Sequence, residues 1–296
     1  MKELLIVIAG ISVAISGDEK AAPLLDPLQR LFRGFLIPQS DNSVTVSLSY
    51  EHSVTLRKFR AEPIRLSTKI DRETTRIINH VAKRYPVSEK TLLVGFFNGV
   101  LAYNVHSRSA HIFLFRSKGK NLLMGSLYKL LFIFTSFLMA AQKKLLAHGA
   151  GLRINAQGNL FLGISGAGKS TVAGFVPAGD VLSDDATVVE NRGGHFQIHP
   201  SPFSQVNMFE KKGETHHRQE APLERIIFLK KAERLALHPR NRQSAMAELL
   251  ALHIHYFDLM DRELKTAVFN FCCDLCAAIP SFDMDFQKND GFLSLL

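Results

Sequence analysis

A glycine-rich segment just past the middle of the chain constrains the fold more than any other feature. Residues 159–176, NLFLGISGAGKSTVAGFV, contain the pattern Gly-x4-Gly-Lys-Ser from Gly163 to Ser170. The apolar run before this pattern is expected to be a strand, whereas KSTVAGFV can open a helix that Pro177 ends. The sequence therefore predicts a strand, a glycine-rich loop and a short helix, an arrangement that suits phosphate binding.

Each residue type in this loop has a physical reason to bind a nucleotide. Glycines allow backbone angles that side chains forbid, so successive N–H groups can converge on one phosphate at the start of the helix. Lys169 is a point charge for phosphate oxygens, and the Ser170 hydroxyl can complete a Mg²⁺ shell. ATP and Mg²⁺ are therefore the expected cofactors. The predicted nucleotide-binding residues are Gly163, Ser165, Gly166, Ala167, Gly168, Lys169, Ser170 and Thr171.

A histidine lies in the apolar segment upstream of the loop. The letters NAQG between two apolar runs predict a β-hairpin that leads into the loop. If Asn155 pairs with Gly158, His148 falls opposite Ser165, within reach of a bound phosphate. The alternative is a histidine whose ring is satisfied inside the core, which is common for a histidine on an apolar strand.

Two adjacent aspartates, Asp184 and Asp185, follow the loop in LSDDATVV, where an apolar strand ends. Adjacent side chains on an extended chain point to opposite sides, so the two carboxylates are expected to have different tasks. One can bind Mg²⁺, directly or through water, and the other can accept a proton from a hydroxyl group. A solvated turn is the alternative interpretation.

The segments AHGAG, GISGAGKST and LSDDATVV, in this order, resemble the catalytic core of HPr kinase/phosphorylase, whose fold is shared with phosphoenolpyruvate carboxykinases. The resemblance covers about residues 145–190 and continues loosely towards the C-terminus. It implies that His148 lies beside the transferred phosphate and that Lys169 and Ser170 bind phosphates and Mg²⁺. It also implies that Asp184 is the proton acceptor and that Asp185 is metal-linked or structural.

The sequence departs from that family at several points. The loop ends GKST where HPr kinases usually have GKSE, and their glycine-rich signature beginning Glu-Ile-Arg-Gly has no counterpart here. HPr is therefore not expected to be the acceptor, and a serine of another protein, a peptide serine and a small-molecule hydroxyl stay open. Hexamers occur in the resembled family, which leaves a homo-oligomer open as well.

Strand-like and helical patterns alternate along the chain, so the expected fold class is α/β, a mixed sheet with flanking helices. The resemblance refines this to a phosphoenolpyruvate-carboxykinase/HPr-kinase-like P-loop core with an N-terminal α+β extension. The expected domains are an accessory region over residues 1–115 and the nucleotide-binding catalytic core over residues 116–296.

The formal net charge of +9 favours acidic partners. The basic stretch at 56–84 is either a solvated helix face or a surface for an acidic partner. It lacks interleaved aromatic residues, which argues against nucleic acid. Arg240 and Arg242, in HPRNRQ, either reach a phosphate or lie in a solvated turn.

Two apolar runs resemble targeting or membrane segments. Leu4–Ile15 is rich in Ile and Val and is broken by Gly10, which favours two short strands over a signal peptide. Leu122–Ala141 is interrupted by Lys129, which favours a buried helix over a membrane span. A cytoplasmic protein is therefore expected. The three cysteines, all in FCCDLC, are expected on a buried helix without chemistry of their own.

Together these features predict a P-loop kinase with Asp184, His148 and Lys169 as catalytic residues and with Ser170 and Asp185 at the metal. The alternative is a regulatory or scaffold module that binds a nucleotide without transferring phosphate.

Overall fold

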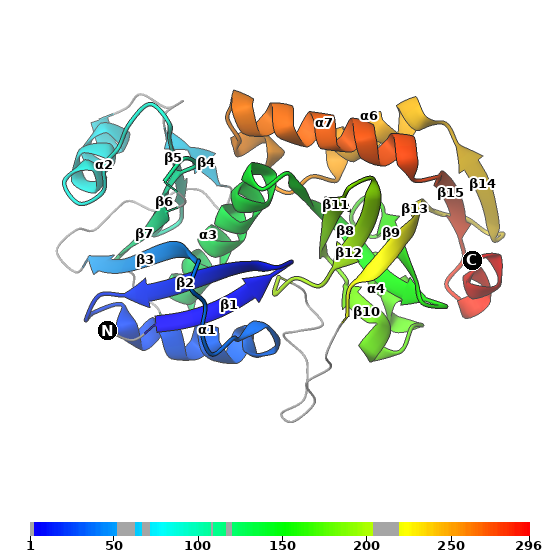
Figure 1. Ribbon diagram of the computed structural model, residues 1–296, viewed down its shortest axis with the longest axis horizontal. Helices are drawn as coiled ribbons and strands as arrows, with labels where there is room; N and C mark the ends of the chain where they lie inside the picture. Colours follow the sequence, from blue (N-terminus) through cyan, green and yellow to red (C-terminus); the bar gives the residue numbers. More distant parts are fainter. Residues whose placement is uncertain (1–2, 52–62, 67–71, 108, 117–119, 204–218) are drawn as a thin grey trace. The chain divides into compact units, whose positions relative to one another are not determined.

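The computed structural model (Figure 1) describes residues 3–51, 63–66, 72–107, 109–116, 120–203 and 219–296. The chain forms two compact units, one of Met1–Leu138 with Asp258–Asp261 and the other of Met139–Phe257 with Arg262–Leu296. The sequence-based boundary was drawn at residue 115/116. Much of the basic stretch at 56–84 lies outside the described residues.

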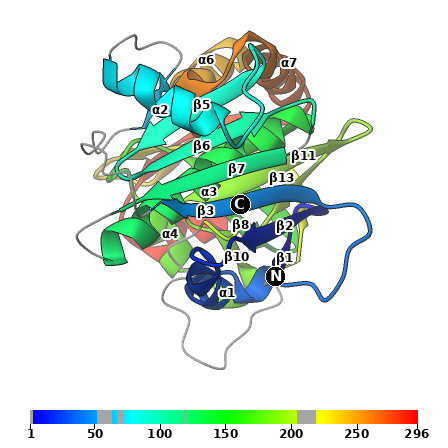
Figure 2. The same cartoon turned by 90° about the vertical axis from the view of Figure 1, so that its left-hand side faces the viewer.

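The first unit contains a seven-stranded mixed sheet in the order β1-β2-β3-β7-β6-β5-β4. Strands β2, β3 and β7 are parallel neighbours, and the other pairs are antiparallel. Figure 2 shows β3, β7, β6 and β5 side by side. The strands are β1 Glu3–Ile8, β2 Ile11–Gly17, β3 Val44–Glu51, β4 Ile64–Arg65, β5 Thr91–Phe96, β6 Gly99–Asn104 and β7 Ser109–Phe115.

The apolar N-terminal run forms the β1–β2 hairpin, as predicted. Ile8 pairs with Ile11, and the two residues between them, Ala9 and Gly10, have φ of 48° and 76°. Two positive φ angles give a turn whose twist matches that of the flanking strands.

In the described part of this unit, three α-helices accompany the sheet: α1 Leu25–Leu31, α2 Arg72–Ala82 and α3 Lys120–Ala141. Val81 of α2 packs in one cluster with Ala102 of β6, while the next residue, Tyr103, meets the ring of Phe134 in α3 at a centroid distance of 5.4 Å. Successive side chains of a strand point to opposite faces, so α2 and α3 cover opposite faces of the sheet.

Helix α3 is the one helix, among the described residues, that is long and apolar enough to cross a membrane. Within its segment Asn121–Ala141, an 18-residue window has a mean hydropathy of 1.8, and 72% of that window is buried. The predicted buried helix is confirmed, because Phe134 and Phe137 pack on Tyr103. The helix ends at Ala141, because Lys143 has a φ of 55° and β8 begins at Lys144.

The second unit contains an eight-stranded mixed sheet in the order β10-β8-β11-β12-β13-β15-β14, with β9 between β8 and β13. The long strands β8 and β13 pair with different neighbours along their length. The strands are β8 Lys144–Ile154, β9 Gln157–Leu162, β10 Val181–Ser183, β11 Ala186–Arg192, β12 His195–His199, β13 Ala221–Lys231, β14 Ala236–Arg240 and β15 Ser281–Phe286.

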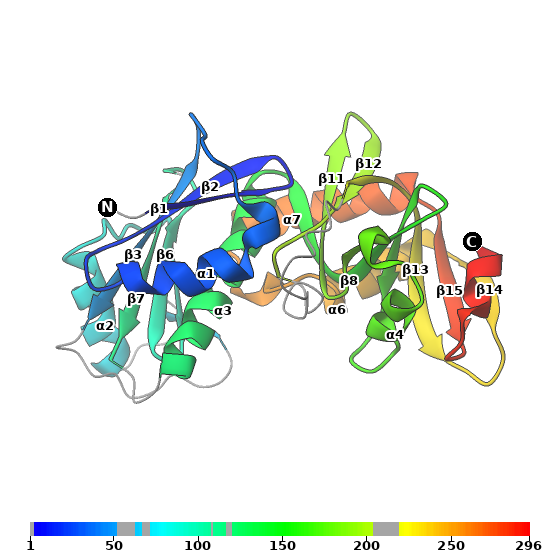
Figure 3. The same cartoon turned by 90° about the horizontal axis from the view of Figure 1, so that it is seen from below.

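Helices cover both faces of this second sheet. The helices are α4 Lys169–Gly174, α6 Arg242–Leu252 and α7 Arg262–Ala278, with a 3₁₀ segment η6 at Asp290–Leu295. Val172 of α4 and Phe292 of η6 share one buried cluster with Phe161 of β9. On the other side, Phe271 of α7 meets Phe196 of β12. Figures 1 and 3 show α4 on one side of the sheet and α6 with α7 on the other.

The predicted mixed sheet with flanking helices is therefore confirmed. One stretch predicted as a turn, HPRNRQ, instead contains the end of β14 and the start of α6, with Asn241 capping the helix through Ser244 N at 2.8 Å. The cysteines lie on α7 as expected. Cys272 and Cys276 are buried, and burial raises the pKa of the Cys276 thiol to about 11, which makes this thiol unreactive near neutral pH.

Candidate functional site

The glycine-rich loop joins β9 to α4, in the strand–loop–helix order that the sequence predicts. Gly166 and Gly168 have φ of 80° and 119°, in the region that side chains disfavour. A Cβ on Gly163 would lie 2.7 Å from the Cβ of Ala167, so this position also requires glycine. The loop turns back on itself through a hydrogen bond from Ala167 N to Ile164 O at 3.0 Å.

Lys169 points back into this loop. Its side chain is 8% exposed, and Nζ donates to Gly163 O at 2.6 Å and to Ile164 O at 3.5 Å. Burial lowers the pKa of Lys169, and the neighbouring Asp185 carboxylate opposes this shift. A cation is thus held at the loop, close enough to Asp185 for their charges to interact.

The other predicted nucleotide-binding residues differ in their exposure to solvent. Ser165, Gly166 and Ser170 are exposed, and Thr171 is half-buried, whereas the Ala167 methyl group belongs to the core cluster. Ser170, the residue after Lys169, is therefore accessible to solvent.

The hairpin before the loop exists, but its predicted register is wrong by two residues. Ile154 pairs with Gln157, and Asn155 and Ala156 form a two-residue turn with φ of 53° and 64°. The expected pairing of Asn155 with Gly158 would have put Ala156 and Gln157 in the turn, whereas the observed pair of positive φ angles at Asn155 and Ala156 suits the twist of antiparallel strands. As a result His148 does not lie opposite Ser165.

The observed register nevertheless leaves His148 near the start of the loop. Gly149 pairs with Leu162, the last residue of β9, so His148 lies one position beyond this pair, at the level where Gly163 begins the loop. On its other edge β8 pairs with β11, and Ala186 lies opposite His148. Asp185, one residue earlier, is thereby brought beside the histidine.

The two aspartates occupy the connection between β10 and β11. The Ser183 hydroxyl shapes this connection by accepting hydrogen bonds from Asp185 N at 3.3 Å and Ala186 N at 2.9 Å. Asp184 is 6% exposed, whereas the side chain of Asp185 is 35% exposed. The two carboxylates therefore occupy different environments, as the extended chain leads one to expect.

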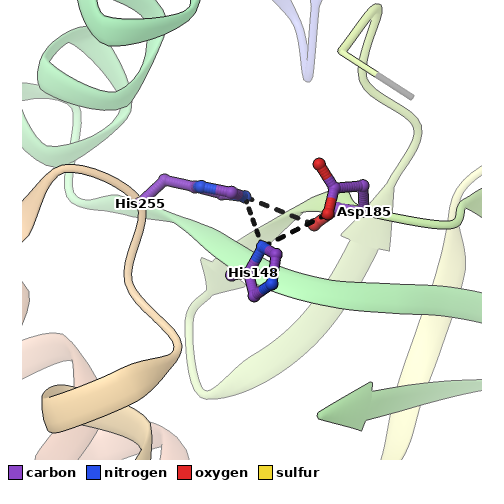
Figure 4. Close-up of side chains that lie close together, drawn as sticks. All are labelled: His148, Asp185 and His255. Atoms are coloured by element: carbon purple, nitrogen blue, oxygen red, sulfur yellow. Dashed lines mark hydrogen bonds and ion pairs between the residues drawn. The ribbon is translucent and has the colours of Figure 1, made fainter. Parts of the chain in front are cut away.

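A second histidine, His255, completes a cluster that sequence reasoning missed (Figure 4). His148 Nδ1 lies 3.3 Å from Asp185 Oδ1 and 3.3 Å from His255 Nε2. His255 follows α6 in the letters ALHIHYFD, and its Nε2 is also 3.3 Å from the backbone oxygen of Asp185. The available signal was the pair of histidines in the letters HIH, directly after the helix.

The other histidine of that pair, His253, packs inside the protein and not at the cluster. It is fully buried and stacks obliquely near Phe228 at a centroid distance of 6.0 Å. Burial lowers its pKa to about 4, so the ring is neutral at physiological pH.

Arg240 and Arg242 have protein partners. Arg240 donates to Asp283 at 2.9 Å and to Glu248 at 2.6 Å, with its guanidinium 4.1 Å from the centre of the Phe228 ring. Arg242 donates to Cys273 O at 3.1 Å. The interpretation of Arg240 in a solvated turn is therefore wrong, because this side chain is paired and packed, whereas a phosphate contact stays an untested prediction.

Fold and site together define a mixed α/β protein whose second unit carries a glycine-rich strand–loop–helix beside a histidine–aspartate cluster. The chain belongs to the family described as SynChlorMet cassette protein ScmC, which matches residues 116–294. No curated protein matches the chain.

The sequence-based resemblance to HPr kinase/phosphorylase is wrong as a family assignment. The family that matches is ScmC, and residues 145–190, which carried the resemblance, lie inside that match. Short motifs around a glycine-rich loop can be shared by proteins of different families, because such motifs follow from the chemistry of binding and not from common descent.

Proposed function

We propose that the second unit is a P-loop kinase core that binds MgATP and transfers the γ-phosphoryl group to a hydroxyl acceptor. The acceptor would be a serine of a peptide or protein, or a small molecule. One observation carries the proposal: buried Lys169 of the loop interacts electrostatically with Asp185, whose carboxylate contacts His148 at 3.3 Å. A cation suited to phosphate and groups suited to phosphoryl transfer thus belong to one site.

Nucleotide binding would use the loop and its first helical turn. The backbone angles of Gly166 and Gly168 allow successive N–H groups to face one phosphate. Lys169 Nζ, which now donates to a loop carbonyl at 2.6 Å, would exchange that acceptor for phosphate oxygens. The exposed Ser170 hydroxyl and the Asp185 carboxylate would hold Mg²⁺.

In phosphoryl transfer the two aspartates would have different roles. Asp185 lies among imidazole groups and suits a metal-linked role, which leaves Asp184 as the proposed proton acceptor for the attacking hydroxyl. Asp184 is 6% exposed, so it would act where little water competes with the acceptor. His148 would offset charge on the transferred group, and positioning with electrostatics would supply most of the rate.

The test uses purified chain, γ-labelled ATP and Mg²⁺ in an extract of its own cells. Wild type and Asp184→Asn are compared, with products separated into small molecules, peptides and proteins, and ATP binding is measured separately by calorimetry. We expect label transfer by wild type only, with similar ATP affinity for both. Equal loss of binding and transfer in the variant would contradict the role of Asp184.

A nucleotide-binding regulatory module is the alternative from another class. It predicts that both proteins bind ATP and that neither transfers label in any extract containing the acceptor. The labelled fraction, when one appears, identifies the class of acceptor. The cytoplasmic location expected from the sequence agrees with the use of ATP and stays part of the proposal.

A further inference from the structure

The cluster of His148, Asp185 and His255 brings together three potential metal ligands from separate parts of the second unit (Figure 4). His148 comes from β8, Asp185 from the β10–β11 connection and His255 from the segment after α6. One ligand atom from each residue lies within 4.8 Å of the other two. Among the described residues this is the one such group of three or more histidine, cysteine or acidic side chains.

Backbone hydrogen bonds hold the three residues in register with one another. His148 N donates to His253 O at 2.8 Å, and His255 N donates to Leu146 O at 3.3 Å, so the segment carrying His255 runs antiparallel along β8. Gly149 N donates to the backbone oxygen of Asp185 at 3.0 Å. The main chain therefore fixes the spacing of the cluster, as is needed for a preorganised site.

Two distances within the cluster, both from His148 Nδ1, fit a metal ion. Nitrogen and oxygen ligands of Zn²⁺ lie about 2.0–2.2 Å from the metal, and two such ligands in tetrahedral geometry lie about 3.3–3.5 Å from each other. His148 Nδ1 is 3.3 Å from both Asp185 Oδ1 and His255 Nε2. A single proton on Nδ1 can point at only one of these two atoms, whereas a cation between them is attracted to all three.

The ligand types and their exposure indicate the class of metal. Two imidazoles and a carboxylate suit Zn²⁺, Mn²⁺, Fe²⁺ or Co²⁺, whereas Mg²⁺ prefers oxygen ligands alone. The side chains of His148 and Asp185 are 32% and 35% exposed. Three protein ligands at a partly open position leave room for a water or a substrate oxygen, which is typical of catalytic rather than structural metal sites.

We infer that His148, Asp185 and His255 form a binding site for a divalent transition metal ion, with at least one coordination position open to solvent. The site would lie beside the glycine-rich loop, since Asp185 also interacts with Lys169. A metal there would polarise an oxygen of a substrate bound next to it. The inference does not require the proposed kinase activity, because it concerns a metal bound by the protein without a nucleotide.

The test titrates metal-free, untagged protein with Co²⁺ and then Zn²⁺ in the absence of nucleotide. Wild type is compared with His255→Gln and with a control, His195→Gln, which changes an exposed histidine at the start of β12. We expect one equivalent of Co²⁺ with visible absorption typical of four or five ligands, displaced by Zn²⁺. We expect affinity to fall at least tenfold in His255→Gln and to stay unchanged in the control.

Thermal unfolding keeps the test decisive if a variant is poorly folded. A metal that binds only the folded chain raises the melting temperature of wild type, and Zn²⁺ should do so here without nucleotide. Wild type that neither binds Co²⁺ nor gains stability from Zn²⁺ would overturn the inference. Binding that requires ATP and survives His255→Gln would also overturn it, because the metal would then be held by the nucleotide. Kinase activity is assayed separately with Mg²⁺, so the metal site and the kinase activity can each be refuted without the other.

Discussion

His148 and Asp185 lie 3.3 Å apart, Nδ1 to Oδ1, because β11 pairs with β8 in a register that puts Ala186 opposite His148. The glycine-rich loop begins where the other partner of β8, strand β9, ends. One strand therefore positions the histidine with respect to both the loop and the aspartates. This arrangement makes β8 the element on which the proposed chemistry depends.

Replacing Lys169 by methionine tests the proposed nucleotide site. Methionine keeps most of the volume of this 8% exposed side chain but removes the charge. We expect at least a tenfold loss of ATP affinity, measured by calorimetry, and no label transfer. Lys230→Met, at an exposed position of β13, is the control. Unchanged ATP affinity in the Lys169 variant would count against the loop as the nucleotide site.

The sequence was enough to predict much of this unit, since its signals are local. The strand before Gly163, the helix after Gly168 and the connection at Asp184–Asp185 follow from apolar runs, glycines and adjacent polar residues. Register and tertiary partners are not local. Which two residues formed the turn depended on Asn155 and Ala156 both adopting positive φ, which the letters NAQG do not decide.

His255 and Arg240 show a second limit of local reasoning. His255 approaches His148 through an isolated backbone bridge between Ala147 and Ile254, a contact between segments far apart in sequence. Arg240 was seen in a polar, turn-like stretch, and only the fold reveals that Asp283 and Glu248 face it. The family could not be inferred from the loop motifs, because proteins of different families can share such motifs.

Gly168→Ala tests whether the loop conformation matters. Its φ is 119°, and a Cβ would lie 2.9 Å from the ring of Phe286, so both backbone strain and a close contact oppose the substitution. We expect a loss of about 1–3 kcal/mol in unfolding free energy and weaker ATP binding. Gly174→Ala is the matched control, since nothing lies within 4 Å of a Cβ there and alanine suits a helix. Equal effects in urea unfolding would contradict this account.

Arg240→Met separates a packing role from phosphate binding. The change removes the Arg240 partner of Glu248, leaves Asp283 with Lys230 as a cation at 3.2 Å, and removes the contact with the Phe228 ring. Because the Arg240 side chain is 11% exposed, we expect a loss of about 2–3 kcal/mol in unfolding free energy with ATP affinity unchanged. The exposed Arg234→Met should change neither quantity. Lost ATP affinity at unchanged stability would instead assign Arg240 to the nucleotide.

The lowered pKa of His111, in the first unit, predicts how the stability of the protein depends on pH. Burial lowers its pKa to about 4, while Asp18 opposes and Arg84 reinforces the shift, and its Nε2 lies 2.7 Å from Ser49 Oγ. Since the unfolded chain binds a proton more readily, with a pKa of about 6.5, stability is complete above that pH and falls towards pH 4. The loss is at most about 3 kcal/mol. His111→Gln has no titrating side chain at this position, so its unfolding free energy should decline less between pH 6.5 and pH 4 than that of wild type. The control, His195→Gln, should behave like wild type. Identical slopes for all three proteins would refute the role of His111 in this pH dependence.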